Sequence, residues 1–132
     1  MADNVTPVVL SVDKFDDREV YKVDYKFTQK TDKEGQLAGI PRGGIINVVV
    51  KALNTGNNQL LHWMLAPTDP HDVKVVFNST KDGTVMKTIE AKGCYCVHYK
   101  ENWADGQLHS EEISFVCQEM TIGSVEFKNP WN

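Results

Sequence analysis

The feature that most constrains the fold is a run of alternating residues from Val85 to Trp103, after which the chain turns and comes back. Alternation with period two places one face of a strand against a core and the other against solvent. The face expected to be dry carries Val85, Ile89, Ala91, Gly93, Tyr95, Val97 and Tyr99. The face expected to be wet carries Met86, Thr88, Glu90, Lys92, Cys94, Cys96, His98 and Lys100. Since strands usually span about 5 to 6 residues, this one is over-long, and we expect it to bend at Gly93. A strand of this length is typical of the wall of a β-barrel, or of a sheet that continues into a neighbouring molecule.

Size and charge limit the classes of protein that remain. A chain of 132 residues is one domain, so we expect a single domain over residues 1–132. The net charge is −4, from 18 acidic and 14 basic residues. The basic residues are spread thinly, which argues against binding to nucleic acid or to an anionic membrane surface.

The expected location follows from the N-terminus and the cysteines. No stretch approaches the roughly 20 apolar residues of a spanning helix, and residues 7–10 are too short for a signal-peptide core. Three cysteines, two of them at i and i+2, form no disulfide framework and favour a reducing compartment. We therefore expect a cytoplasmic chain, or one that is exported without a cleavable signal.

The periodicity predicts a mainly β fold: a small antiparallel β-barrel with one short α-helix. Strands are expected at 8–12, 21–27, 45–53, 73–77, 85–103 and 113–117, and 124–127 is a candidate to close the sheet. The helix is expected at about 57–66, because Asn57 or Asn58 can cap it and Pro67 ends it. Residues 28–44 have no periodicity and are expected to form a long extended loop, a length that is often functional.

The histidines and cysteines do not compose a catalytic or metal site. Cys94, Cys96 and His98 would share one strand face, but i, i+2, i+4 spacing spreads them over about 13 Å. Metal bonds near 2.0 to 2.3 Å cannot span that distance. No nucleophile elbow or phosphate loop is present, so we predict no enzyme activity and no cofactor. Glu111 and Glu112 are expected to form a solvated hairpin edge.

A ligand-binding barrel is the alternative from another class. Tyr95, Tyr99 and Trp103 would line the cavity of a monomeric lipocalin-like barrel, although such aromatic residues are more often core. That fold needs eight regular up-and-down strands, and the sequence provides six or seven.

A series of short motifs matches a known pattern in order and spacing. It runs through Asp32, Gly35 and Arg42-Gly43-Gly44, then Leu61-His62-Trp63-Met64, Tyr95 with Val97 to Asn102, Glu112-Ile113-Ser114 and Asn129-Pro130-Trp131. The chain resembles, from about Tyr21 to Trp131, the tube protein of bacterial type VI secretion systems, the haemolysin-coregulated protein family, in its Bacteroidetes form. The resemblance implies that residues 1–132 form one barrel domain, with residues 1–18, longer than usual for the family, as a candidate variable N-terminal extension.

The resemblance implies a structural protein that assembles with itself. Six barrels would form a ring, and rings would stack into a hollow tube that carries or delivers effector proteins. The further partners implied are the contractile sheath, the baseplate and the spike, with no nucleic acid and no membrane insertion. Family members leave the cell without a signal peptide, which agrees with the N-terminus. A phage-type tail-tube protein remains a second alternative.

The resemblance also implies roles for named residues. The long loop would contact the adjacent subunit or ring, with the contact residues Thr31, Asp32, Gly35, Gly39, Arg42, Gly43 and Gly44. Replacing residues 39–44 by a short linker should then abolish ring stacking. The expected barrel core comprises Tyr25, Phe27, Val48, Trp63, Met64, Tyr95, Tyr99 and Phe115. The wet face of one set of strands would line the lumen.

Overall fold

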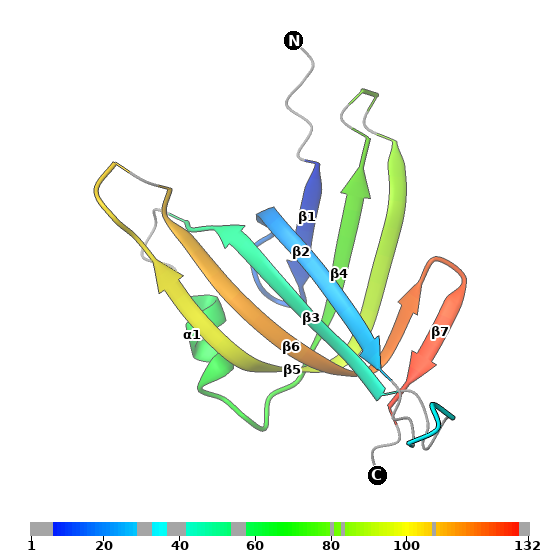
Figure 1. The fold of residues 1–132 in the computed structure, drawn as a ribbon. Coiled ribbons are helices and arrows are strands. Elements are labelled where there is room, and N and C mark those ends of the chain that lie inside the picture. Colours follow the sequence, from blue (N-terminus) through cyan, green and yellow to red (C-terminus); the bar gives the residue numbers. More distant parts are fainter. Residues whose placement is uncertain are drawn as a thin grey trace.

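A computed structural model describes residues 7–28, 33–36, 42–53, 58–79, 81–82, 84–106 and 108–129. Within these residues lie one helix, α1 (Gln59–Met64), and seven strands. The strands are β1 (Val8–Val12), β2 (Arg18–Thr28), β3 (Arg42–Lys51), β4 (His71–Asn78), β5 (Val85–Asn102), β6 (Ser110–Ile122) and β7 (Val125–Lys128). Figure 1 shows the strands curving around one another, with α1 lying behind β5 in this view.

The strands form one antiparallel sheet that closes on itself. Their order is β3-β2-β1-β4-β5-β6-β7, and an additional pairing of β3 with β6 closes six of them into a barrel. The predicted mainly β barrel with one short helix is therefore confirmed. Residues 124–127 do not close the sheet: β6 uses its first half for β3 and its second half for β7, so β7 extends the wall outside the ring of six. Residues 42–44 belong to β3, which makes the connection shorter than predicted.

Strand β5 is long because it belongs to both halves of the barrel. Its first half pairs with β4 and the second half of β6, and its second half pairs with the first half of β6. The predicted bend at Gly93 is confirmed, since φ is +63° there and β5 holds one extra residue opposite β4. In Figure 1 the strand descends beside β4 and then sweeps across the bottom of the barrel.

The predicted alternation of β5 is wrong at Val85, which is 60% exposed, and again past Gly93. Past Gly93, Cys94 and Cys96 are buried, whereas Tyr95 is only partly buried and Val97 is exposed. A second register shift between Cys96 and His98 turns Tyr99 back toward the core. Opposite β4, Met86 is a further extra residue near the start of the strand. Each extra residue moves the following side chains to the opposite face, so a single parity cannot hold through a strand with three bulges.

The barrel interior is a packed apolar core. Its fully buried residues from the strands include Leu10, Ile46, Val48, Val50, Val75, Ile89, Ile113 and Phe115. Helix α1 adds Leu60 and Trp63, and the Trp63 ring lies 5.7 Å from that of Phe115. A helix this short is unstable alone, so burial of these two side chains holds it. A filled six-stranded barrel leaves no room for the ligand of a lipocalin-like fold.

Candidate functional site

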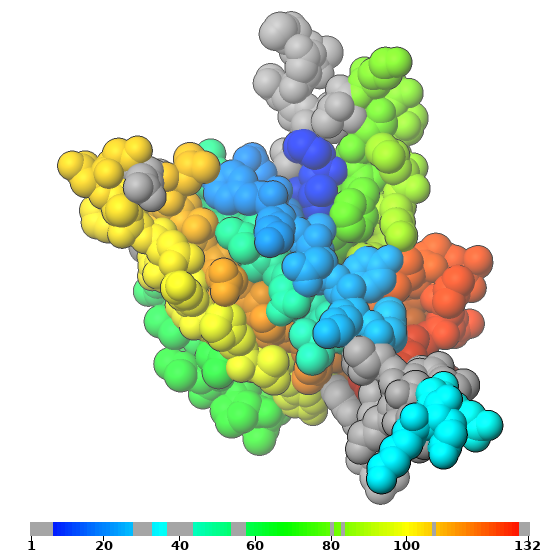
Figure 2. Space-filling view, viewed as in Figure 1, coloured from blue at the N-terminus to red at the C-terminus, as the bar shows by residue number. Residues whose placement is uncertain are grey.

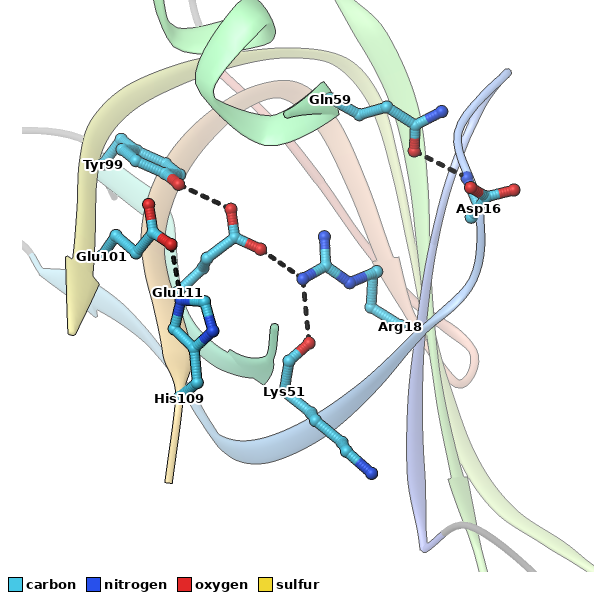
Figure 3. A network of polar contacts seen from close by, with 8 residues as sticks. All are labelled: Asp16, Arg18, Lys51, Gln59, Tyr99, Glu101, His109 and Glu111. Carbon is cyan, nitrogen blue, oxygen red and sulfur yellow. Dashed lines mark hydrogen bonds and ion pairs between the residues drawn. The ribbon is translucent and has the colours of Figure 1, made fainter. Parts of the chain in front are cut away.

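Three parts of the molecule gather polar or aromatic side chains that could have a function: the two ends of the barrel and its outer wall. At one end, which we call the polar end, four strands meet around a buried ion pair (Figure 3). Arg18 of β2 pairs with Glu111 of β6, and both are at least 95% buried. Arg18 Nη2 also donates to the Lys51 carbonyl of β3 at 2.8 Å, and Tyr99 of β5 donates its hydroxyl to Glu111 Oε2 at 2.6 Å. The pair thus ties the ends of β2, β3, β5 and β6 together.

Two further contacts at the polar end involve residues of loops. The Asp16 amide donates to Gln59 Oε1 of α1 at 3.0 Å, and His109 contacts the Glu101 carboxylate in the β5–β6 hairpin (Figure 3). Glu111 was expected at a solvated edge, and that prediction is wrong. It shares the inward parity of Ile113, which was the signal in the sequence that would have placed it inside.

The Tyr99 hydroxyl stays protonated in this environment. Burial raises its pKa above the ordinary value, and the hydrogen bond to the Glu111 carboxylate raises it further. A neutral phenol can donate its proton to a carboxylate, whereas a phenolate would repel it. The Tyr99 hydroxyl is therefore a fixed donor to Glu111 in the structural network of the polar end.

The opposite end, the aromatic end, is closed by ring contacts. Phe27 of β2 and Phe127 of β7 meet edge to face with centroids 4.7 Å apart. Gly44 lies beneath them as the extra residue of a bulge in β3, with φ at +73°. A Cβ at Gly44 would lie 3.3 Å from Phe127 Cε2 and 3.5 Å from Met120 Cε. Gly44 therefore lets β7 approach β3 closely.

A polar row crosses the outer wall between the two ends. Asp24, Asn47, Ser114 and His98 are successive cross-strand partners on β2, β3, β6 and β5. The Asn47 amide donates to Asp24 Oδ1 at 2.8 Å, and the Ser114 hydroxyl donates to Asn47 Oδ1. Asp24, Asn47 and Ser114 are thus hydrogen-bonded in series along the wall, and His98, at the end of the row, is exposed.

The cysteines lie inside the wall. Cys94 and Cys117 face each other across β5 and β6 with sulfur atoms 2.7 Å apart, and the hydrogen bond between them, with burial, raises the pKa of Cys94. Burial raises the pKa of Cys96 to about 11. His98 points outward and contacts Glu112, so it does not join them. Within the described ranges no three His, Cys, Asp or Glu residues are grouped to hold a metal ion.

The predicted contact residues are distributed over different environments. Thr31, Asp32 and Gly39 lie outside the described residues. Gly35 is exposed with φ at +83° and open space around it. Arg42 and Gly43 pair with Thr28 and Phe27 inside the β2–β3 ladder, and Gly44 is buried.

The predicted core residues are also unequal in burial. Val48, Trp63 and Phe115 are fully buried, while Tyr25, Met64 and Tyr99 are partly buried against the core. Phe27 is 37% exposed at the aromatic end, and Tyr95 lies outside the core because of the bulge at Gly93. Trp103, expected as core, is 76% exposed beyond the end of β5.

Comparisons with known proteins agree on one family and one fold. The sequence model of the family described as Hemolysin coregulated protein Hcp (TssD) matches residues 6–132. Hcp1 from Flavobacterium johnsoniae is 28% identical, with a TM-score of 0.83 and coverage of 92% of this chain and 98% of that one. No curated protein gives a significant match.

More distant solved structures share the fold alone. Hcp1 from the EAEC 042 pathovar of E. coli is 13% identical, with a TM-score of 0.76 and coverage of 95% of this chain and 99% of that one. A chain of the PVC sheath–tube complex, an extracellular contractile injection system, is 13% identical with a TM-score of 0.56, covering 92% and 90%. In the part of the chain that the structure describes, no helix is long and apolar enough to span a membrane.

Proposed function

Because the chain belongs to the Hcp (TssD) family, we propose that it is the structural subunit of a type VI secretion tube, with six copies closing into a ring and rings stacking into a hollow tube. The observation that carries this proposal is the family match over residues 6–132, together with the likeness to Hcp1 of Flavobacterium johnsoniae over 98% of that chain. The tube would carry effector proteins and meet sheath, baseplate and spike proteins. The contractile apparatus would export it without a cleavable signal.

The barrel supports a structural role in two ways. Its interior is filled by side chains, so binding has to take place on outer surfaces. Its outer wall carries a row of polar residues across four strands, from Asp24 to His98, in which Asp24, Asn47 and Ser114 are hydrogen-bonded in series. A wall of this kind is suited to facing water inside a tube.

The segment between β2 and β3 is the proposed stacking contact. Residues 33–36 are exposed, and Gly35 has a backbone that favours glycine and free space around it. Gly44 has a different part in this proposal, since it is buried under Phe127 and shapes the base of the segment. Thr31, Asp32 and Gly39 remain proposed contacts, and Arg42 and Gly43 would hold the segment at the end of the ladder.

Negative-stain electron microscopy and light scattering of the purified protein test the proposal. We expect annular particles and a mass near six chains. A strictly monomeric species over a wide range of concentration would overturn the tube function.

The stacking contact has its own experiment. Thr28 and Arg42 are paired across β2 and β3, so an Asn-Gly turn can replace residues 29–41 and still join the strands. We expect this variant to form single rings that no longer stack. Tubes of unchanged length would exclude the segment from stacking and leave ring formation untouched.

A further inference from the structure

We propose that Cys94 and Cys117 form an oxidation site, at which a peroxide converts the two thiols into a disulfide between β5 and β6. The disulfide would join the two longest strands of the barrel near their middle. This inference goes beyond the proposed function and stands on the geometry of the two residues. The proposed export of the chain would expose the pair to oxidants, because an exported protein leaves a reducing compartment for an oxidising one.

The backbone holds the two residues at the spacing of a disulfide. Cys94 and Cys117 lie directly opposite each other in the antiparallel pairing of β5 with β6. Opposite residues in such a pair have Cα atoms about 4.5–5.5 Å apart, and disulfides join Cα atoms that are about 4.4–6.8 Å apart. The register therefore allows the bond to form without a movement of the backbone.

The two side chains also lie on the same side of the wall. Both residues are buried, with 0% and 1% of their surface exposed, and their sulfur atoms are 2.7 Å apart. This separation is below the roughly 3.5–4.0 Å at which unbonded carbon atoms pack, and the S–S bond is about 2.0 Å long. A small rotation of the two side chains is therefore enough to bring the sulfur atoms to bonding distance.

The third cysteine of the chain provides an internal contrast. Cys96 is buried on the same strand as Cys94, but its partner across β6 is Phe115. The Cys96 thiol donates to the His98 carbonyl at 3.4 Å. Since all three thiols are buried, burial does not select a pair, and the register of β5 against β6 does. The geometry thus assigns the disulfide to one of the three possible pairings.

The oxidation is a two-electron reaction that balances with one molecule of hydrogen peroxide. The thiolate of one cysteine attacks a peroxide oxygen, the O–O bond breaks, and a sulfenic acid and hydroxide form. The hydroxide takes the proton that the first thiol released and becomes water. The second sulfur then attacks the sulfenic sulfur, so that the S–S bond forms and the S–O bond breaks. The hydroxide that leaves takes the proton of the second thiol, and both peroxide oxygen atoms end as water.

Access to the sulfur atoms sets the rate of this reaction. Strand β6 pairs with β5 from Ser110 to Ile122, and in Figure 2 its atoms lie between those of β5 and β3. The hydrogen bond to Cys117, together with burial, raises the pKa of Cys94 and keeps its reactive thiolate scarce. We therefore expect the pair to react during local openings of the wall, and the same cover to protect the disulfide from reductants.

Treatment of the purified, reduced full chain with hydrogen peroxide tests the site. After exposure, the protein is unfolded in N-ethylmaleimide, and its free thiols are counted by mass spectrometry. We expect one free thiol in place of three, and a peptide that links Cys94 to Cys117. The matched variants are Cys96→Ala, which should still form the disulfide, and Cys94→Ala, which should form none.

A second measurement removes the barrier of access. The reduced chain is refolded from urea with an equimolar amount of hydrogen peroxide, so that the oxidant reaches both sulfur atoms before the wall closes. We expect the disulfide between Cys94 and Cys117 to be the main product. It should raise the midpoint of thermal unfolding by about 5 °C or more, because a cross-link lowers the entropy of the unfolded chain. Dithiothreitol added to the unfolded protein should reverse the shift.

Each outcome decides the inference. Three free thiols after both treatments, or a linked peptide that contains Cys96, would overturn it. Sulfinic acid at Cys94 or Cys117 in place of the disulfide would also overturn it, since the neighbouring sulfur would have failed to capture the sulfenic acid. Ring formation is measured separately on the reduced protein. A failure of the tube function therefore leaves the oxidation site in place, and a failure of the site leaves the tube function in place.

Discussion

The two ends of the barrel are closed by opposite means. The polar end is closed by a buried ion pair, in which Arg18 and Glu111 contact each other and bond to the Lys51 carbonyl and the Tyr99 hydroxyl. The aromatic end is closed by rings that pack over a residue without a side chain, Gly44. Removing one partner of a buried ion pair leaves the other charge buried and unpaired. Adding a side-chain atom where two strands pass close together creates a steric clash. The ends should therefore fail under different substitutions and by different amounts.

The largest expected effect is at the polar end. Glu111→Ala leaves the Arg18 guanidinium buried without its counter-charge and leaves the Tyr99 hydroxyl without its acceptor. Removing one partner of a buried pair costs about 3–5 kcal/mol, a large part of a typical free energy of unfolding of about 5–15 kcal/mol. Urea unfolding at pH 7 measures the loss.

A double variant separates lost charge from lost packing. Arg18→Met with Glu111→Gln removes both charges and keeps a carbonyl acceptor for Tyr99. Because a buried pair contributes little beyond an apolar replacement of similar volume, we expect more than half of the lost stability to return. A loss below about 1 kcal/mol in the single Glu111→Ala variant would mean that this ion pair behaves as an exposed one.

The second effect concerns the hydrogen bond from Tyr99. Tyr99→Phe should lower the free energy of unfolding by about 1.5–3 kcal/mol at pH 7, because the lost bond is to a charged acceptor. The folded protein raises the pKa of Tyr99, so its contribution is fully present below the ordinary tyrosine pKa of about 10. It is lost as the pH rises further, since the unfolded chain releases the proton first. The difference between wild type and variant should therefore narrow above that pH. A difference independent of pH would contradict the assignment.

A smaller effect is expected from an added methyl group at the aromatic end. Gly44→Ala must hold alanine at φ +73° and place its Cβ 3.3 Å from the Phe127 ring. The backbone conformation alone costs about 1–2 kcal/mol. Gly35→Ala is the matched control, because its φ is +83° but nothing lies within 4 Å of the added Cβ. The extra loss at Gly44, measured by urea unfolding, reports the packing of β7. Equal losses at the two glycines would show that Phe127 moves away freely.

The alternation of apolar and polar residues predicts much of the fold. It fails where the structure depends on bulges or on pairing between distant strands. The alternation near Tyr25, Val48 and Phe115 placed three strands correctly, because uninterrupted pairing keeps one parity on one face. On β5 the alternation failed at Cys94, since a bulge needs only one glycine and leaves no other mark in the sequence. Closure by β3 and β6 was not predictable either, because pairing between distant strands depends on the curvature of the whole sheet.

The polar end and the aromatic end also differ in how far the sequence predicts the surroundings of their residues. Glu111 stood on the inward parity of its strand and could have been placed inside by that rule alone. Its partner Arg18 is distant in sequence, and nothing in the chain pairs the two before folding. The sequence predicts that Gly44 belongs to a loop, whereas its role comes from its contact with Phe127, a residue of the last strand. The core follows from local patterns, but the two closures depend on contacts between remote segments.

The smallest expected effect is at a second ion pair, near the aromatic end. Lys128 and Glu119 lie 3.8 Å apart on β7 and β6, and their side chains are 70% and 44% exposed. Exposed pairs contribute about 0–1 kcal/mol, and salt screens them. Glu119→Gln should therefore change the free energy of unfolding by less than about 0.5 kcal/mol, and the change should vanish in high salt. The same substitution at Glu111 should remain costly in high salt, because water and ions do not reach that pair. A salt-sensitive loss at Glu111 would show that the polar end is open to solvent and would remove the contrast between the two closures.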